Sequence, residues 1–134
     1  MFHRVIEIRT QGREELIDVT EQVHRTISEA GSTNGVITLF VPHTTAAVTL
    51  NENWDPDVQR DVLDWLRRLV PRDGLFRHGE GNSDAHIKAS LFGPSVQLML
   101  VDGRLRLGRW QGIYFCEFDG PRLRHLEIAV TSTE

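Results

Sequence analysis

Residues 36–41 read Val-Ile-Thr-Leu-Phe-Val and are followed directly by Pro42. Four of the six residues are β-branched and one is aromatic, a composition typical of a buried strand. Proline cannot donate to a sheet ladder, so the strand is expected to end at Pro42. The strand therefore presents His43 at its end.

The segment before this strand predicts two short strands and a helix. Residues 5–8 and 16–19 are β-prone runs on either side of the turn-like Gln11-Gly12, which indicates an opening antiparallel pair. Thr20 resembles an N-cap, and apolar residues at helical spacing follow it up to Gly31. We therefore expect a first helix over roughly residues 21–30.

The segment after the strand predicts another strand, over residues 46–50, and then a longer helix. Asp55 suits an N-cap and Pro56 suits the first helical position, while Pro71 closes the segment. One apolar stripe at helical spacing supports this helix and comprises Val58, Val62, Trp65, Leu66 and Leu69.

The remainder of the chain predicts a loop, a short helix and a set of strands. Residues 72–84 are polar and glycine-rich, and Asp84 is expected to cap a short helix over residues 85–91. Strands over residues 96–101, 105–118 and 123–130 are separated by strong turn signals at Asp102-Gly103 and Asp119-Gly120-Pro121, which favours an antiparallel meander. We predict a single α+β domain over residues 1–134, with a largely antiparallel sandwich-like or barrel-like core and two main helices.

Composition limits the possible functions. The 134 residues are 40% hydrophobic and 25% charged, which is ordinary for a soluble globular domain. The net charge of −4 combines 15 basic and 19 acidic residues without a basic cluster, so no nucleic-acid partner is expected. No signal peptide or membrane span of about 18 apolar residues is present, and a cytoplasmic protein without a membrane partner is expected.

Six histidines provide the first candidates for chemistry. His3, His24 and His125 lie in or beside polar segments and are interpreted as surface residues. His43 differs because Thr44 and Thr45 follow it, and their hydroxyls could fix its ring or bind an anion. A hydrogen-bonded core histidine without a functional role explains His43 about equally well.

A second histidine-bearing stretch runs from His78 to His86. It carries Glu80, Asn82, Ser83 and Asp84, and its glycines, including Gly81, allow close backbone approach to a ligand. An anion could bind at the start of the following helix with help from Lys88. The spacing matches no standard zinc motif and by itself favours an ordinary capped loop, but His43, His78 and His86 together would form a known catalytic zinc arrangement if they met.

Five further residues are considered on weaker grounds. Glu52 follows a strand, where a solvated carboxylate is as reasonable as a general base or a partner of a metal ligand. Glu117 alternates onto an apolar face and needs a partner such as Arg122 or Arg124. Cys116 is expected to be packing rather than a nucleophile. Trp110-Gln111 suits either strand packing or a pocket wall.

Several multi-residue motifs occur together in one order along nearly the whole chain. They are HTTAA at residues 43–47, EGNSDAHIK at 80–88, LGRWQGI at 107–113 and EFDGPR at 117–122. Together they resemble the YjbQ-like (UPF0047) family. The family pattern predicts a small residue at position 109, where this chain has Arg109.

The resemblance implies an α+β fold, a homotrimer and a secondary thiamine-phosphate synthase activity, in which a pyrimidine pyrophosphate is condensed with a thiazole phosphate. It also implies His43, His78 and His86 as metal ligands, with Asp84 and Glu52 as polar supports. The candidate catalytic residues are therefore Glu52, Asp84 and His86. The candidate substrate-binding residues are Thr44, Thr45, Gly81, Asn82, Lys88, Trp110, Gln111 and Arg122.

The expected cofactor is a divalent metal ion, either Zn²⁺ or Mg²⁺. Phosphate chemistry favours Mg²⁺, whereas three imidazoles favour Zn²⁺. A metal-dependent hydrolase of a small phosphorylated metabolite is the enzymatic alternative, because a metal-bound hydroxide suits imidazole ligands. A non-catalytic trimeric protein that binds a metabolite or a metal is the second alternative.

Overall fold

The computed structural model describes residues 1–133, so Glu134, the last residue of the expected domain, lies outside the described residues. Within this range the chain forms helices and strands in an α+β arrangement, as predicted. The helices are α1 (Thr20–Ser28), α2 (Pro56–Leu69) and α3 (Ser83–Phe92). The strands are β1 (Phe2–Arg9), β2 (Glu15–Asp18), β3 (Gly35–Phe40), β4 (Ala46–Glu52), β5 (Ser95–Val101), β6 (Arg104–Leu105), β7 (Gln111–Glu117) and β8 (Leu123–Ser132).

The strands form two antiparallel sheets. One sheet has the strand order β1-β8-β3-β5-β6, and the other has the order β2-β7-β4. Among residues 1–133, no helix is long and apolar enough to cross a bilayer. The predicted antiparallel core is confirmed, and α1, α2 and α3 correspond to the two main helices and the short helix that the sequence predicts.

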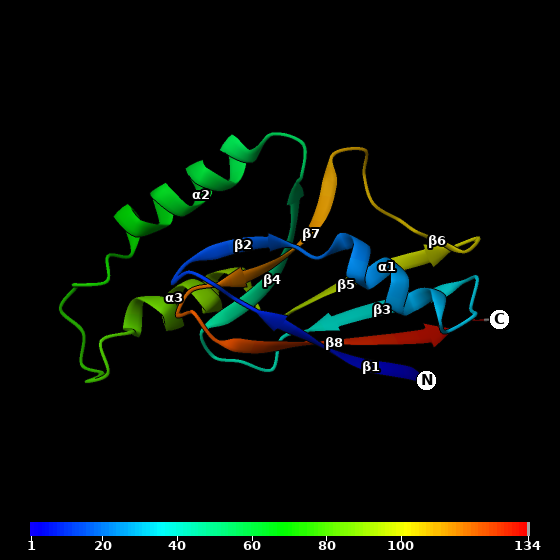
Figure 1. Ribbon diagram of the computed structural model, residues 1–134, viewed down its shortest axis with the longest axis horizontal. Coiled ribbons are helices and arrows are strands. Elements are labelled where there is room, and N and C mark those ends of the chain that lie inside the picture. Colours follow the sequence, from blue (N-terminus) through cyan, green and yellow to red (C-terminus); the bar gives the residue numbers. More distant parts are fainter. Residues whose placement is uncertain (134) are drawn as a thin grey trace.

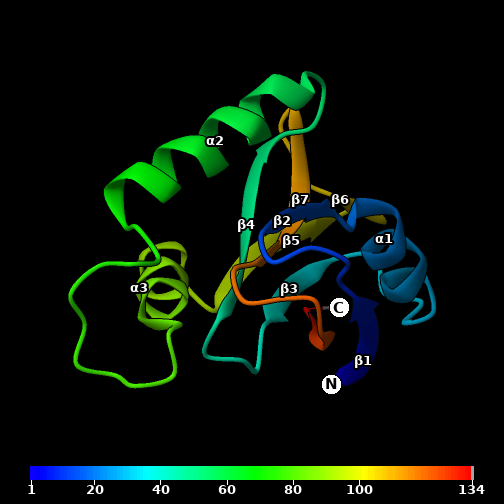
Figure 2. The same cartoon turned by 60° about the vertical axis from the view of Figure 1, so that its left-hand side comes forward.

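The three-stranded sheet is buried on both faces, because alternate side chains of β7 point into two different hydrophobic cores. Ile113 and Phe115 point into the larger core, which the five-stranded sheet and α1 complete. Tyr114 and Cys116 point the other way, into a smaller core shared with α2 and α3. Figures 1 and 2 place α2 and α3 on one side of the molecule and α1 on the other. Burial also raises the pKa of the Cys116 thiol, in keeping with a packing role.

Helix α2 begins where the sequence predicts. The Asp55 side chain accepts a hydrogen bond from the backbone N–H of Asp57 at 2.9 Å, and Pro56 is the first helical residue. The apolar stripe is only partly covered, because Leu66 is buried while Trp65 and Leu69 are 58% and 69% exposed. Helix α2 lies along the outside of the molecule (Figure 1), and these two apolar side chains remain exposed to solvent.

The predicted pairing of the first two strands is wrong. β1 pairs with β8 and β2 pairs with β7, so the two strands belong to different sheets. The predicted C-terminal meander is also wrong. Only β5 and β6 form a hairpin, across the predicted turn at Asp102 and Gly103 with φ of 52° and 77°, whereas β7 joins the three-stranded sheet.

Two predicted helix caps are also corrected. Thr20 is the first residue of α1 rather than its cap, and both its N–H and its hydroxyl donate to the Asp18 carboxylate. Helix α3 begins at Ser83, with Asn82 at the cap position, so Asp84 lies inside the first turn. The Asp84 side chain is fully buried rather than turned back to the helix end.

Candidate functional site

The two histidine-bearing stretches line one open pocket of about 910 Å³. His43 comes from the loop after β3, His78 from the loop before α3 and His86 from α3 itself. Arg122, from the turn between β7 and β8, lies on the same pocket. The remaining lining residues are Phe40, Val41, Pro42, Thr44, Thr45, Glu80, Asn82, Pro94, Asp119 and Arg124.

His43 reaches this position because β3 ends early. The last residue of β3, Phe40, is paired with Glu127 of β8, so β3 does not extend as far as His125. The backbone N–H of His125 donates instead to Nε2 of the His43 ring at 2.9 Å. The His43 and His125 rings are also stacked, with centroids 6.0 Å apart and planes at 21°. His43 thus completes the hydrogen bonding of the sheet at this end.

The environment of His43 disfavours a positive charge. Burial lowers the pKa of His43, and the nearby Arg124 guanidinium and His125 add to the lowering. A neutral imidazole is also what the hydrogen bond needs, because only neutral imidazole has a lone pair to accept the His125 N–H.

His78 and His86 line the same pocket and contact each other. Their rings meet edge to face, with centroids 5.4 Å apart and planes at 86°. Glu80 Oε2 lies 3.7 Å from Nε2 of His78 and is largely exposed. Two imidazoles from one loop and the following helix are therefore brought together, although they are eight positions apart in the sequence.

Arg122 is held at the pocket by Asp119. Its Nε donates to the Asp119 carbonyl at 2.7 Å, and one terminal nitrogen donates to the Asp119 carboxylate at 3.0 Å. Asn82 Nδ2 donates to the same carboxylate oxygen at 2.9 Å. Because Arg122 uses only some of its five N–H groups in this way, others are left to meet an anion.

A buried ion pair lies beneath the pocket, between the two sheets. Glu117 of β7 and Arg124 of β8 are 0% and 4% exposed, and two guanidinium nitrogens of Arg124 contact the Glu117 carboxylate. Thr10 also donates to Glu117 at 2.7 Å, and Arg124 donates to the Thr45 hydroxyl at 2.8 Å. Of the two expected partners of Glu117, Arg124 is the one that pairs with it.

Asp84 and Lys88 lie outside the pocket, contrary to their predicted roles there. Lys88 is 1% exposed and its ammonium contacts Glu14 at 2.8 Å and Asp84 at 3.0 Å. Arg13 donates to both Asp84 oxygens at 3.0 Å. Burial alone would raise the pKa of Asp84, but the hydrogen bonds from Arg13 and Lys88 outweigh it and lower the pKa to about 2. The structure uses this cluster to join α3 to the turn between β1 and β2.

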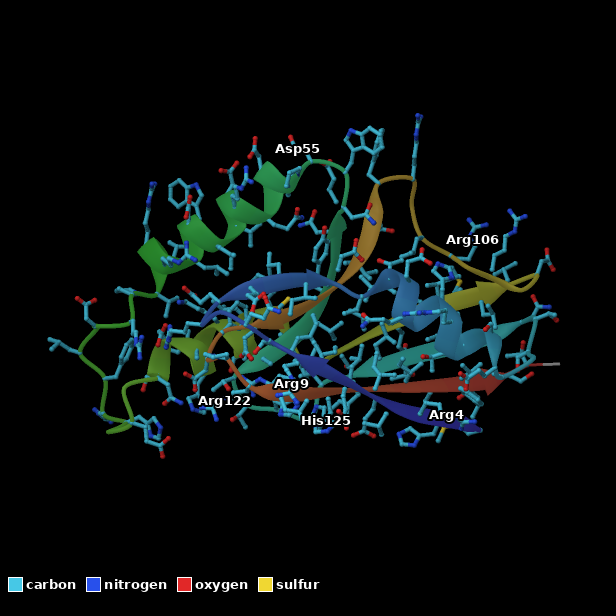
Figure 3. The ribbon with its side chains drawn as sticks, viewed as in Figure 1. Arg4, Arg9, Asp55, Arg106, Arg122 and His125 are labelled. Atoms are coloured by element: carbon cyan, nitrogen blue, oxygen red, sulfur yellow. The ribbon has the colours of Figure 1, made fainter. Side chains whose placement is uncertain are left out.

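Three other candidates lie at the far end of the three-stranded sheet. Glu52 ends β4 and is paired with Gln111, the first residue of β7. A rise of about 3.3 Å per residue places Glu52 about 20 Å along β4 from the pocket end. Trp110 packs edge to face on Trp54 at that same end. Figure 3 shows the separation, with Arg122 and His125 on one side of the molecule and Asp55, which follows Glu52, on the other. Within one chain, Glu52, Trp110 and Gln111 do not share a site with the histidines.

The remaining substrate-binding candidates divide in two. Thr44, Thr45, Asn82 and Arg122 line the pocket, whereas Gly81 does not, although its φ of 77° helps to shape the loop.

The residues present do not fit the expected three-imidazole metal site. Among residues 1–133, no three His, Cys, Asp or Glu side chains are grouped closely enough to hold one metal ion. Nε2 of His43 already accepts the His125 N–H, and Nδ1 of a neutral imidazole then carries the proton. His43 has no lone pair left for a metal ion, so of the three expected ligands His78 and His86 remain.

The sequence interpretation misses three contributors to the pocket. The sequence indicates Asp119 only as part of a turn and His125 only as a surface residue, yet Asp119 positions Arg122 and His125 positions His43. Arg124 is expected only as a partner of Glu117, yet it also lines the pocket. The alternation of β8 contains a signal for Arg124, since Arg124 shares a face with the buried Leu126 and Ile128. No local signal identifies His125, because its role depends on where β3 ends.

Comparison with known proteins places the chain among close relatives. The family model described as "UPF0047 protein YjbQ-like" matches residues 4–133. The UPF0047 protein MJ1081 of Methanocaldococcus jannaschii is 48% identical and covers 92% of this chain and 90% of its own length. The UPF0047 protein YugU of Bacillus subtilis is also 48% identical, over 90% of this chain and 92% of its own length.

Solved structures agree with the sequence comparison. A Clostridium acetobutylicum protein described as an uncharacterized conserved protein of the yjbq/upf0047 family superposes with a TM-score of 0.94 at 47% identity, covering 96% of this chain and 99% of its own. The hypothetical protein APE1520 of Aeropyrum pernix gives 0.95 at 36% identity, covering 98% and 99%. The fold and the sequence together show that the chain belongs to the YjbQ-like (UPF0047) family.

Proposed function

We propose that this chain is an enzyme that acts on phosphorylated small molecules in the histidine pocket. The reaction that we propose is the condensation of a pyrimidine pyrophosphate with a thiazole phosphate to give thiamine phosphate. The observation that carries the proposal is the convergence of His43, His78, His86 and Arg122, from four separate segments, on one pocket of about 910 Å³. This volume lies within the usual range for small-molecule sites.

The chemistry of the condensation suits the groups that line the pocket. The thiazole ring nitrogen attacks the methylene carbon of the pyrimidine, a carbon–nitrogen bond forms, and the carbon–oxygen bond to pyrophosphate breaks. The thiazole nitrogen carries no hydrogen, so no general base has to remove a proton. The protein then has to orient two reactants and stabilise charge on the departing pyrophosphate. The absence of Glu52 and Asp84 from the pocket is compatible with this requirement.

Arg122 is the residue best placed to meet the departing pyrophosphate. It lines the pocket, and its hydrogen bonds to Asp119 hold the guanidinium in a fixed orientation. Guanidinium groups recognise phosphate oxygens through paired N–H donors. The hydroxyl of Thr44, which also lines the pocket, offers a further donor.

The hydrolase alternative is less well supported, because it requires metal ligands that residues 1–133 do not group together. Mg²⁺ still belongs in any assay, since the oxygens of pyrophosphate are the ligands that this ion prefers. A protein that binds the metabolite without turnover is the other outcome that the assay distinguishes.

The test is thiamine phosphate formation by the purified protein from the two precursors with Mg²⁺. We expect product from the wild type, a loss of at least about tenfold in His86→Ala, and wild-type rates in His24→Ala, whose histidine lies on α1 and does not line this pocket. Product that is absent, or equal in wild type and His86→Ala, contradicts the synthase proposal. Binding of both precursors without product supports the non-catalytic alternative.

We also propose that the chain forms the homotrimer that the family resemblance implies. Trp65 and Leu69 are large apolar side chains left exposed on the outer helix α2. Exposed apolar residues of this size on one helix are typical of a protein–protein contact. Association through α2 would cover them.

A further inference from the structure

The end of β3 leaves one backbone amide of β8 without a strand partner. β3 ends at Phe40, opposite Glu127, and His125 lies two residues nearer the start of β8. An unpaired N–H in a partly buried position is costly, so it needs an acceptor. The acceptor is Nε2 of the His43 ring, at 2.9 Å.

This hydrogen bond determines which ring nitrogen of His43 carries the proton. A nitrogen that accepts a hydrogen bond must keep its lone pair, so Nε2 is unprotonated. The neutral ring then has its proton on Nδ1. The stacked ring of His125 fixes the orientation of the His43 ring. The positive charge of the adjacent Arg124 disfavours a second positive charge on His43, so the ring stays neutral.

We infer that His43 serves the pocket as a neutral hydrogen-bond donor through Nδ1, held in that tautomer by the backbone amide of His125, and that it binds an acceptor oxygen of the ligand. The inference rests on the proposed function, because a phosphorylated molecule supplies that oxygen. An ionised phosphate offers only acceptors, and Nδ1–H has no hydrogen-bond partner among the described residues. His125 is thus a positioning residue, which acts through His43 rather than on the ligand.

Two substitutions distinguish the role of Nε2 of His43, the acceptor, from the role of Nδ1, the donor. In His43→Gln, the amide oxygen of the new side chain lies near the position of Nε2, so the acceptor for His125 is preserved and the donor to the ligand is lost. In His43→Asn, the amide nitrogen of the new side chain lies near the position of Nδ1. This second variant therefore preserves the donor and loses the acceptor.

The binding test uses inorganic pyrophosphate and isothermal titration calorimetry. We expect His43→Gln to melt close to the wild type but to bind pyrophosphate about tenfold more weakly. We expect His43→Asn to melt at a lower temperature but to bind within about threefold of the wild type, measured below its melting temperature. Equal loss of binding in both variants, or a weaker loss in His43→Gln than in His43→Asn, overturns the inference.

The tautomer can be read directly from the imidazole nitrogens. In ¹⁵N NMR spectra of the wild type near neutral pH, His43 should show a protonated Nδ1 and an unprotonated Nε2. Both signals should keep their positions when Zn²⁺ is added. The same pattern should persist in His125→Ala, which keeps the backbone amide. A protonated Nε2, or a His43 signal displaced by Zn²⁺, overturns the inference.

These outcomes are distinct from failure of the proposed function. If no thiamine phosphate forms, but pyrophosphate binds and the two His43 variants separate as described, the synthase proposal fails and the role of His43 stands.

Discussion

At the scale of single residues, the buried ion pair with Glu117 holds Arg124 at the pocket, where Arg124 is one of the lining residues. Both side chains lie between the two sheets, and Arg124 reaches from Glu117 to the hydroxyl of Thr45. Two charges removed from water are stabilised only by each other and by the hydrogen bonds around them. Loss of one partner should therefore leave an uncompensated charge in the core.

Glu117→Gln is expected to lower the free energy of unfolding by about 3 to 5 kcal/mol, because Arg124 would remain buried and charged. Urea unfolding at pH 7 measures this change. Glu127→Gln is the matched control, since Glu127 is partly exposed and pairs with His3 at the surface, and it should cost less than about 1 kcal/mol. A cost for Glu117→Gln as small as that of the control would contradict the account.

The residue scale also shows what the sequence can and cannot predict. Alternation along β7 marks Glu117 as a carboxylate on an apolar face that needs a partner, and Arg122 and Arg124 are nearby candidates for that partner. The same reasoning places Cys116 in the core. No such pattern identifies His125, because its contribution is a backbone amide exposed only by the early end of β3.

At the scale of elements, Asp84 joins α3 to the turn between β1 and β2. Arg13 and Lys88 lower its pKa to about 2, below the ordinary value of 3.8. A carboxyl group whose pKa is lower in the folded state stabilises the fold above its unfolded pKa. That contribution is lost as the pH falls from about 4 through about 2.

Asp84→Asn should therefore destabilise the protein at neutral pH and flatten the dependence of its stability on pH between about 4 and 2. Urea unfolding midpoints across this range measure both effects. Asp61→Asn, at an exposed position of α2, should leave the profile of the wild type unchanged. If Asp84→Asn and the wild type lose stability in parallel over this range, the ion cluster does not stabilise the fold as described.

Helix α2 provides a second test at this scale. Asp55→Ala removes the side-chain acceptor for the Asp57 amide and should cost about 1 kcal/mol at this helix end. Because α2 lies on the outside, we expect the effect to be local, with amide hydrogen exchange about fivefold faster in the first turn of α2. Exchange that accelerates equally in β7 would indicate global destabilisation instead and contradict this reading.

The elements also divide into those that the sequence predicts and those that it does not. Local chemistry suffices for α2, through Asp55 and Pro56, and for β3, through its β-branched run. It fails for strand pairing, because β-prone runs do not encode their partners. β1 and β2 are adjacent in sequence but lie in different sheets. The strands of the expected meander are also divided between the two sheets, because β7 lies in one and β5, β6 and β8 lie in the other. Distant contacts with β7 and β8 determine these pairings.

At the scale of the whole molecule, self-association accounts for the exposed apolar residues of α2. Light scattering coupled to size-exclusion chromatography should give three times the chain mass of 15.3 kDa. The double variant Trp65→Ser and Leu69→Ser should give a lower mass, whereas Arg60→Ser, also exposed on α2, should not. A monomeric wild type contradicts the trimer proposal, and an unchanged trimer in the double variant excludes this face of α2 as the contact.

The whole molecule also explains why the candidate site could be only partly predicted. Four of the candidates drawn from the sequence converge on one pocket: His43, His78, His86 and Arg122. The same sequence argument also selects Glu52 and Gln111, which lie about 20 Å from the pocket end of the three-stranded sheet. Sequence motifs do not distinguish the two ends of a strand. The register of β4 against β7 shows which end of the sheet each candidate occupies, because it pairs Ala46 with Glu117 and Glu52 with Gln111.

The central claim is that the three histidines form one ligand site, and an NMR titration of the imidazole signals with pyrophosphate tests it most directly. The account predicts that the signals of His43, His78 and His86 shift together with a single affinity, while those of His3 and His24 keep their positions. Signals of the three pocket histidines that stay unchanged, or that move no more than those of His3 and His24, would contradict it.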